Sequence, residues 1–256
     1  MADPDDGIGH PLFQLGGQQK GAGAVDFSFV SDFDFVGAFW MTIQLAFWSA
    51  IGSAVLGTVL TAMRVSPVPV MRAAATTYVN VVRNIPLTVV MFYMSQVLYT
   101  TLGLKLASRG AGAAGAQAFL DSQFFRLAVL GLVLYTSTFV SEALRSGINT
   151  VPVGQAEAAR AIGLGFSQIL GLIVLPQAFR AVIAPLGSVL IALIKNTTVA
   201  SAIGVGEAAV LMNTMLEFRP DQRTAIFLLI AGGFIVLTLP TGLLFGWLAK
   251  RSAVKR

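Results

Sequence analysis

The sequence predicts an all-α membrane protein with five transmembrane helices, and three observations support this fold class. Hydrophobic residues make up 55% of the 256 residues and charged residues only 11%, whereas soluble domains carry about 25% charged residues. The mean hydropathy is +0.77, so much of the surface must face lipid or other apolar protein. Two runs, 35–63 and 224–249, contain no charged residue, and each is longer than the roughly 20 apolar residues that cross a bilayer.

The predicted spans follow one another without room for a second domain. The first, 35–63, ends at a proline-rich turn, because proline cannot continue a helix. The second, 70–104, is interrupted at Arg83-Asn84-Ile85-Pro86, where Pro86 removes a helical hydrogen bond and the charge of Arg83 is costly in lipid. This pattern predicts a broken or kinked helix that faces the protein interior. The other spans are predicted at 124–144, between Pro176 and Ile194, and at 224–249, and the Gly/Ala-rich segment 103–121 is predicted to be a loop.

The N-terminal segment 1–34 differs in composition from the membrane domain, 35–256. It holds six Asp and one Lys and is rich in glycine, which predicts a largely disordered tail. A signal peptide is not predicted, because it would need a basic start and a short apolar core.

The placement of lysine and arginine predicts the orientation, because cytoplasmic loops carry an excess of both. With segment 1–34 outside, nine of these residues fall on the cytoplasmic side and five on the outer side. The N-terminus is therefore expected outside and the C-terminus in the cytoplasm. This topology accounts for the net charge of +5 without a nucleic-acid partner.

Several chemistries lack the residues that they need. The chain has no cysteine and a single histidine, His10, so thiolate chemistry, a histidine metal site and a histidine-dependent triad are not expected. No G-x-x-x-x-G-K-[ST] phosphate loop occurs, so this chain is not expected to be an enzyme, to hydrolyse ATP alone or to bind a cofactor.

The loop between the third and fourth spans, about 150–176, carries the clearest motif. Pro152 is well placed at a helix start, and residues 153–162 have the pattern of a short amphipathic helix. Gly163 and Gly165 allow a sharp turn into a second helix. The predicted topology makes this loop cytoplasmic, and a short helix at a membrane face suits docking into a groove on a soluble partner.

The spacing of Glu157-Ala158-Ala159, Gly163 and Leu175-Pro176 resembles the E-A-A signature loop of permeases of ATP-binding-cassette (ABC) importers. The resemblance covers about residues 35–256 and implies the five-helix fold of type I importer permeases. In that family the loop forms a coupling helix that sits in a cleft on the ATPase. An ATPase-coupling role is therefore implied for Glu157, Ala158, Ala159, Gly163, Leu175 and Pro176.

Two further segments resemble the polar amino-acid permeases of this family. Val82–Leu87 is similar to their R-x-x-P-L element, and Leu193–Ser201 is similar to their L-x-K-[ND]-T-[ST] element. Asn196 and Thr198 stand where many relatives have Asp and Ser, and both keep their hydrogen-bonding capacity. Shorter stretches such as Tyr135–Phe139 resemble a permease of a glutamate-uptake system, which implies L-glutamate as the substrate, with glutamine or aspartate as further candidates.

The resemblance also implies a multi-pass protein of the bacterial plasma membrane that works in an assembly. The expected partners are the lipid bilayer, a second permease, two ATPase subunits and an extracytoplasmic amino-acid-binding protein. The similarity to glutamate systems favours a paralogue as the second permease. ATP and Mg²⁺ are expected to be used by the ATPase subunits.

Lys195 is the most informative charge, because it ends the uncharged run 181–194 and intramembrane cations usually face a cavity or a counter-charge. A substrate carboxylate can meet this ammonium group and the polar side chains that follow it. The predicted substrate-binding residues are Lys195, Asn196, Thr197, Thr198, Ser201 and Arg83. Two structural roles for Lys195 stay open, namely an ion pair with Glu207 or Glu142 and snorkelling to the membrane surface.

Structural roles are also open for two other charged groups. Arg83 has the alternative of capping carbonyls that Pro86 leaves free. Glu142 and Arg145 are three residues apart, so a pair on one helix face is predicted.

The competing function is an ion-coupled secondary transporter or a channel. Such a protein is expected to carry membrane-embedded carboxylates for coupling to a cation or proton. The long runs 35–63 and 224–249 contain none, so the importer permease is the favoured interpretation.

Overall fold

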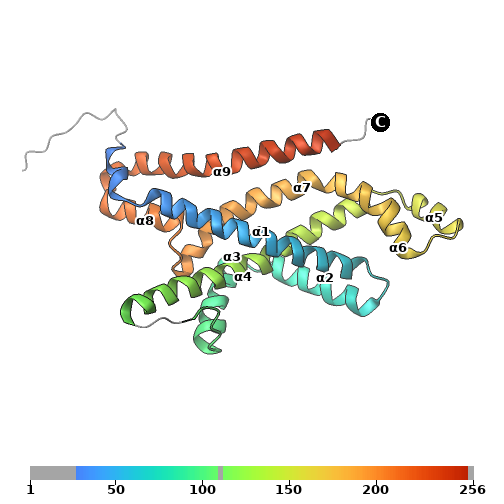
Figure 1. The fold of residues 1–256 in the computed structure, drawn as a ribbon, viewed down its shortest axis with the longest axis horizontal. Coiled ribbons are helices and arrows are strands. Elements are labelled where there is room, and N and C mark those ends of the chain that lie inside the picture. Colours follow the sequence, from blue (N-terminus) through green and yellow to red (C-terminus); the bar gives the residue numbers. More distant parts are fainter. Residues whose placement is uncertain (1–26, 109–111, 253–256) are drawn as a thin grey trace, which may run out of the picture.

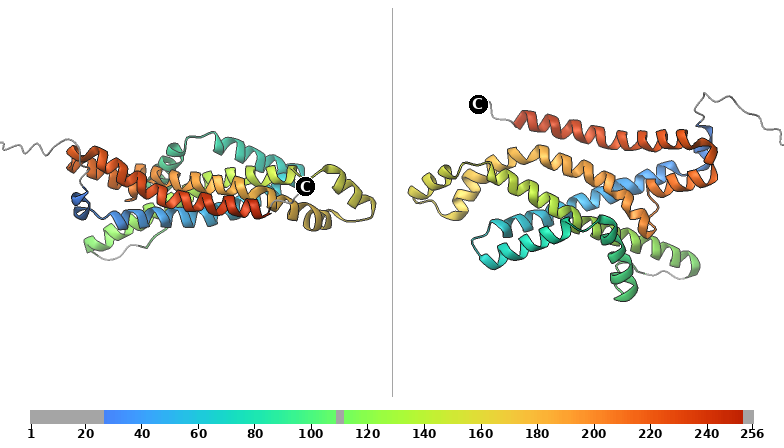
Figure 2. Two further views of the ribbon diagram at one scale, coloured as in Figure 1. Left: turned by 90° about the horizontal axis from the view of Figure 1, so that it is seen from above. Right: turned by 180° about the vertical axis from the view of Figure 1, so that it is seen from behind.

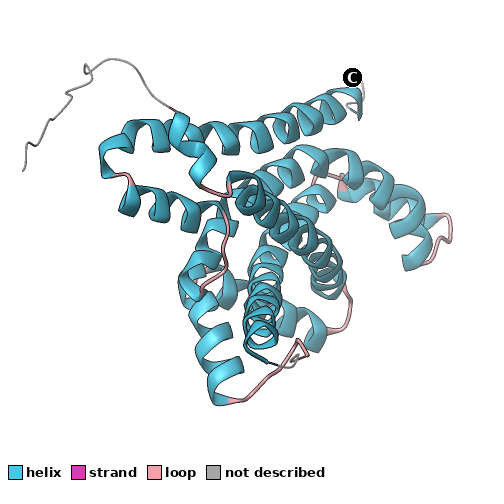
Figure 3. Cartoon of the chain, turned by 60° about the vertical axis from the view of Figure 1, so that its left-hand side comes forward, coloured by secondary structure: helices cyan, strands magenta, loops and turns pink. Residues whose placement is uncertain are grey.

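The computed structural model describes residues 27–108 and 112–252, and every regular element in these ranges is helical (Figure 3). Four helical segments are long and apolar enough to cross a membrane: Phe35–Val65, Ala114–Asn149, Phe166–Ile203 and Pro220–Ser252. A fifth candidate span is a bent pair of helices within the second predicted span. The predicted fold class, an all-α membrane protein, is confirmed.

The centre of the bundle is α4 (Gly112–Asn149), which packs against both α1 (Phe35–Val65) and α7 (Leu175–Asn196). The last helix, α9 (Arg223–Ser252), packs against α7 and forms one side of the molecule (Figures 1 and 2). Little of α9 is buried in the isolated chain. Because its exposed side chains are largely apolar, this surface suits lipid or another membrane subunit.

The second predicted span is broken where the sequence predicted an interruption. α2 (Pro69–Arg83) ends at Arg83, and α3 (Leu87–Phe92) begins after Pro86 and continues as a π-helix over Tyr93–Thr101. The two parts meet at a bend of 104°. The span is therefore broken into two helices rather than kinked within one. Beyond the bend, α3 packs against the 3-10 helix that follows α7. The break therefore turns α3 away from the direction of α2 and towards the end of α7.

The loop predicted for 103–121 is wrong in its second half. α4 begins at Gly112 and runs without interruption to Asn149, so it starts before the predicted third span and ends after it. Alanine has the highest intrinsic helix propensity, and the segment 112–118 is rich in alanine. The apolar run marks only the part of α4 that is suited to lipid, whereas the helix itself extends further.

The segment 1–34 divides into two parts. Residues 1–26, which include most of the predicted disordered tail, lie outside the described residues. Ser28–Asp32 form a 3-10 helix, and the Phe29 side chain is buried in one apolar cluster with Met215 of α8 (Ala208–Phe218) and Ile226 of α9. The packed body of the protein therefore begins before the first span.

Close contact between α1 and α4 depends on a small residue at position 57. A Cβ atom placed on Gly57 would lie 2.6 Å from Val140 Cβ and 3.0 Å from the backbone oxygen of Ser137. Small residues of this kind let transmembrane helices approach closely. The position therefore fixes the distance between the two helices with the most extensive contact in the bundle.

We expect Gly57→Val to destabilise the protein by about 1–3 kcal/mol, the usual range for overpacking. The measurement is the thermal unfolding of the purified protein in detergent. Gly232→Val is the matched control, because no atom outside its own helix lies within 4 Å of a Cβ at Gly232. Equal losses in both variants would contradict the packing argument.

Candidate coupling hairpin and substrate site

The predicted pair of short helices between the third and fourth spans is present. α5 (Val153–Ala161) and α6 (Phe166–Ile169) form a hairpin, called here the α5–α6 hairpin. Its turn depends on Gly163, which has φ +89°, a conformation that glycine adopts without steric cost. Gly163 N donates to Arg160 O at 3.0 Å, and Leu164 N donates to Ala159 O at 3.1 Å. Gly165 has φ −73°, so it is not needed for the reversal of direction.

The hairpin exposes most of the signature residues. Glu157, Ala158 and Gly163 are exposed, whereas Ala159 is buried. Ile162 and Phe166 are 79% and 56% exposed, respectively. Exposed large apolar side chains beside polar ones are typical of an interaction surface. The hairpin therefore has the composition of a docking element.

The α5–α6 hairpin extends from the end of the molecule where α1 turns into α2 and where α9 ends (Figures 1 and 2). Basic side chains occupy the last turns of α1, α5 and α9, namely Arg64, Arg160, Lys250 and Arg251. An excess of lysine and arginine is typical of the cytoplasmic face. This arrangement favours the predicted cytoplasmic position of the hairpin.

The fourth predicted span, between Pro176 and Ile194, lies within α7, but the helical segment that contains it is longer at both ends. α6, a π-helical segment at Leu170–Val174, α7 and a 3-10 helix at Thr197–Ile203 follow one another directly. Leu175 and Pro176 are exposed and begin α7. Proline is accommodated because the helix is widened into π turns immediately before it, where the regular hydrogen-bond pattern is already shifted.

A side-chain contact also joins the two ends of this loop. Gln177 Nε2 donates to Gln155 Oε1 at 2.6 Å and to Ile173 O at 2.9 Å. Gln155 lies on α5 and Gln177 on α7. The hairpin is therefore connected to the fourth span both through the helix itself and through this bond.

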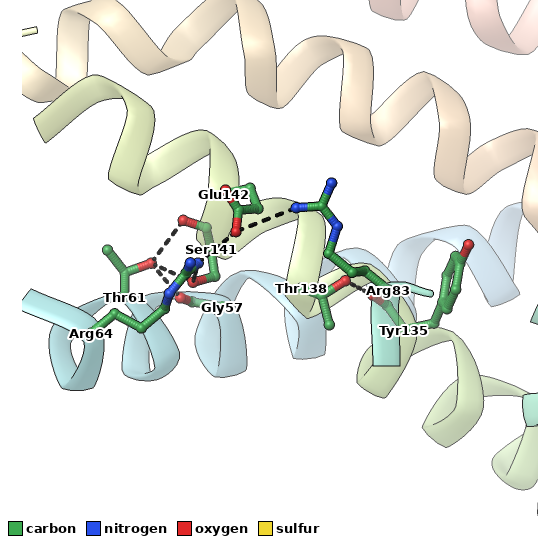
Figure 4. Close-up of polar contacts among 8 residues, drawn as sticks. All are labelled: Gly57, Thr61, Arg64, Arg83, Tyr135, Thr138, Ser141 and Glu142. Atoms are coloured by element: carbon green, nitrogen blue, oxygen red, sulfur yellow. Dashed lines mark hydrogen bonds and ion pairs between the residues drawn. The ribbon is translucent and has the colours of Figure 1, made fainter. Parts of the chain in front are cut away.

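Three charged residues from α1, α2 and α4 meet where these helices come together (Figure 4). Glu142 Oε1 lies 2.8 Å from Arg64 Nη1 and 3.5 Å from Arg83 Nη1. The Arg64 side chain is only 2% exposed, whereas that of Arg83 is 43% exposed. The predicted pair of Glu142 with Arg145 is wrong, because tertiary packing brings two more distant arginines to the carboxylate.

The predicted polar element after α7 adopts a compact conformation. Three hydroxyl groups donate to carbonyls of the preceding turn: Thr197 Oγ1 to Ile194 O, Thr198 Oγ1 to Lys195 O and Ser201 Oγ to Thr198 O. Thr197 is buried, whereas Asn196, Thr198 and Ser201 are partly exposed. The tightening from an α-helix to a 3-10 helix begins at Thr197.

Lys195 is exposed and makes no ion pair within residues 27–108 and 112–252. The two carboxylates named as structural partners are engaged elsewhere. Glu142 pairs with Arg64 and Arg83, and Glu207 accepts from the backbone N–H groups of Ala209 and Val210 at the start of α8. No carboxylate in the described part of the chain therefore neutralises the ammonium group of Lys195, which leaves it available to a substrate.

The fold and this site together define a class of protein. The profile of binding-protein-dependent transport system inner membrane components matches residues 53–254. The chain belongs to this family of ABC transporter permeases and is a multi-pass protein of the cell membrane.

Curated relatives narrow the class to amino-acid transport. The chain is 58% identical over 219 residues to the glutamate transport system permease protein GluC of Corynebacterium efficiens, covering 86% of this chain and 94% of the relative. It is 55% identical to GluC of Corynebacterium glutamicum with the same coverage. It is 31% identical to the glutamate/aspartate import permease protein GltJ of Escherichia coli K12, over 78% of this chain and 82% of the relative.

Solved structures support the fold. The chain matches a crystal structure of an amino acid ABC transporter with histidines, with a TM-score of 0.74 at 23% identity, covering 90% of this chain and all of that chain. It also matches an inward-facing structure of the MetNI methionine ABC transporter, with a TM-score of 0.65 at 17% identity, covering 86% and 96% of the two chains. The chain therefore has the fold of an ABC importer permease.

Proposed function

We propose that this chain is the permease subunit of an ATP-driven importer whose main substrate is L-glutamate. The observation that carries the proposal is the exposed α5–α6 hairpin, which bears the signature residues and continues directly into the fourth span. The names of the most similar curated relatives support glutamate as the substrate. Glutamine and aspartate are further candidate substrates.

The continuous helical segment 166–203 explains how movement of the α5–α6 hairpin can be coupled to substrate transport. Residues 166–203 form one helical segment of 38 residues, which is about 55 Å long at 1.5 Å per residue. One end joins the α5–α6 hairpin, and the other carries Lys195 and the polar residues that follow it. A partner that moves the hairpin therefore moves the candidate substrate-binding residues without an intervening flexible loop.

The proposed assembly contains the partners that this mechanism needs. A second permease, favoured as a paralogue, completes the pathway, because the exposed Lys195 and Arg83 of a single chain require a protein or water environment inside a membrane. Two ATPase subunits bind the hairpins and use ATP with Mg²⁺. A binding protein delivers the amino acid from outside, and closure of the ATPase pair drives alternating access as a rigid-body rearrangement.

The second candidate function, an ion-coupled transporter, has less support from the described carboxylates. Coupling of this kind uses carboxylates that change their charge or bind a cation. Glu142 is neutralised by Arg64 and Arg83. Glu207 is fully buried, but its carboxylate caps α8 by accepting from the backbone N–H groups of Ala209 and Val210. The importer is therefore the better-supported function.

The test is uptake of radiolabelled L-glutamate by proteoliposomes that contain this chain, its neighbouring permease, the ATPase and the binding protein. We expect uptake only when ATP and Mg²⁺ are on the ATPase side and the binding protein is on the other side. Omission of each component in turn provides the controls. Uptake that persists without ATP and follows an imposed ion gradient would reject the proposal in favour of a secondary transporter.

A further inference from the structure

The two arginines that meet Glu142 are placed differently. Arg64 lies at 2.8 Å and is almost completely buried, whereas Arg83 lies at 3.5 Å and is nearly half-exposed. Both approach the same oxygen, Oε1 (Figure 4). The first distance is that of a strong charge-assisted hydrogen bond, and the second is at the limit for one. Glu142 is therefore held firmly by Arg64 and loosely by Arg83.

Arg83 lies where the second span is broken. It is the last residue of α2, at the 104° bend. The helix beyond the bend packs against Thr197–Ile203, the element that follows Lys195. An exposed guanidinium within a membrane-spanning chain faces a cavity or a partner rather than lipid tails. Arg83 and the polar element after α7 are thus connected through α3.

We propose that Arg83 is a specificity-determining residue that binds the side-chain carboxylate of an acidic substrate, and that Glu142 holds it until that carboxylate displaces it. The proposal rests on the proposed function as an amino-acid permease. It assigns Glu142 the role of a positioning residue, because it acts through Arg83 and does not itself contact the substrate.

The exchange of partners leaves the buried guanidinium of Arg64 paired. When Arg83 leaves Glu142, the partly exposed carboxylate keeps its shorter bond to the buried Arg64, so Arg64 does not become an unpaired buried charge. Arg83 exchanges a single long contact for a carboxylate that can accept two parallel N–H bonds from its guanidinium. Glutamine has nearly the same shape as glutamate but offers a neutral amide, so the exchange favours the acid.

The experiment uses the assembled importer in nanodiscs without its binding protein, so that the selectivity of the binding protein does not enter. Binding of radiolabelled L-glutamate and of L-glutamine is measured separately by equilibrium dialysis. For Arg83→Gln we expect glutamate affinity to fall about tenfold and glutamine affinity to stay within about twofold. For Glu142→Gln we expect glutamate affinity to rise about threefold, because the competing carboxylate is gone.

The decisive result is that glutamate affinity changes in opposite directions in the two variants, since both remove the same Arg83–Glu142 contact. A purely structural contact would change binding in the same direction in both. Arg72→Gln is the control, because Arg72 is an exposed arginine on the same helix and makes no ion pair with the described residues. If Glu142→Gln does not assemble, the double variant Arg64→Met/Glu142→Gln replaces it, because it removes the buried charge of Arg64 together with its partner.

Two results would overturn the inference. One is a wild-type complex that binds glutamate no better than glutamine, and the other is a loss of affinity for both ligands in both variants. Neither result decides whether the assembly is an ATP-driven importer, which the uptake assay measures independently. A complex that imports glutamate with ATP, but whose Arg83→Gln variant binds glutamate like the wild type, refutes only the role of Arg83.

Discussion

Gly163→Asp is expected to reduce ATP-driven glutamate uptake to background while the protein remains folded and inserted. A side chain at this position meets open space within the described chain, because no atom lies within 4 Å of a Cβ at Gly163. The positive φ of the turn is tolerated by aspartate better than by most residues. The main effect of the new carboxylate is therefore on whatever docks against the hairpin, through steric bulk and an added charge.

Gly103→Asp provides a matched control for this experiment. Gly103 also has a positive φ, +68°, and no atom lies within 4 Å of its Cβ position, but it lies in the segment after the π-helix at Tyr93–Thr101. The backbone strain is therefore similar, whereas the α5–α6 hairpin is untouched. We expect near-normal uptake from Gly103→Asp and loss of co-purifying ATPase only from Gly163→Asp. Equal defects in the two variants would contradict the docking role.

Lys195→Ala is expected to lower glutamate uptake at least about tenfold at normal expression and assembly. The ammonium group is exposed and has no carboxylate partner in the described part of the chain. Its removal should therefore cost the charge-assisted bond to a substrate carboxylate, a stronger bond than a neutral one. Stability should change little, because no ion pair is broken.

The kinetics of uptake distinguish this role from a structural one. We expect Lys195→Arg to restore part of the activity, because it restores the positive charge. Lys105→Ala, which removes an exposed lysine from the loop before α4, should leave uptake unchanged. Wild-type uptake by Lys195→Ala would remove Lys195 from the substrate site.

Short sequence patterns correctly predicted the membrane spans, the break in the second span and the turn of the α5–α6 hairpin. Apolar runs located four spans, the Arg83–Pro86 interruption located the break, and Gly163 located the turn of the α5–α6 hairpin. Each of these signals depends on residues close together in the chain. Lipid requires a long apolar run, proline cannot donate a helical hydrogen bond, and only glycine adopts a positive φ freely.

Tertiary geometry accounts for what the sequence could not predict. Local spacing paired Glu142 with Arg145, but the crossing of α1, α2 and α4 brings Arg64 and Arg83 to its carboxylate instead. Pro176 marked the start of α7, but no local signal predicted the π turns at Leu170–Val174 that join α7 directly to α6. In both cases the outcome depends on contacts or hydrogen-bond shifts that no single stretch of sequence encodes.

The central claim is that the α5–α6 hairpin is a cytoplasmic element on which an ATPase acts. The chain contains no cysteine, so Ala158→Cys places a single thiol on the exposed face of α5. A membrane-impermeant thiol reagent should label it in inside-out vesicles but not in right-side-out vesicles, and added ATPase subunits should block the labelling. Labelling from the outer face, or no protection by the ATPase, would contradict the account.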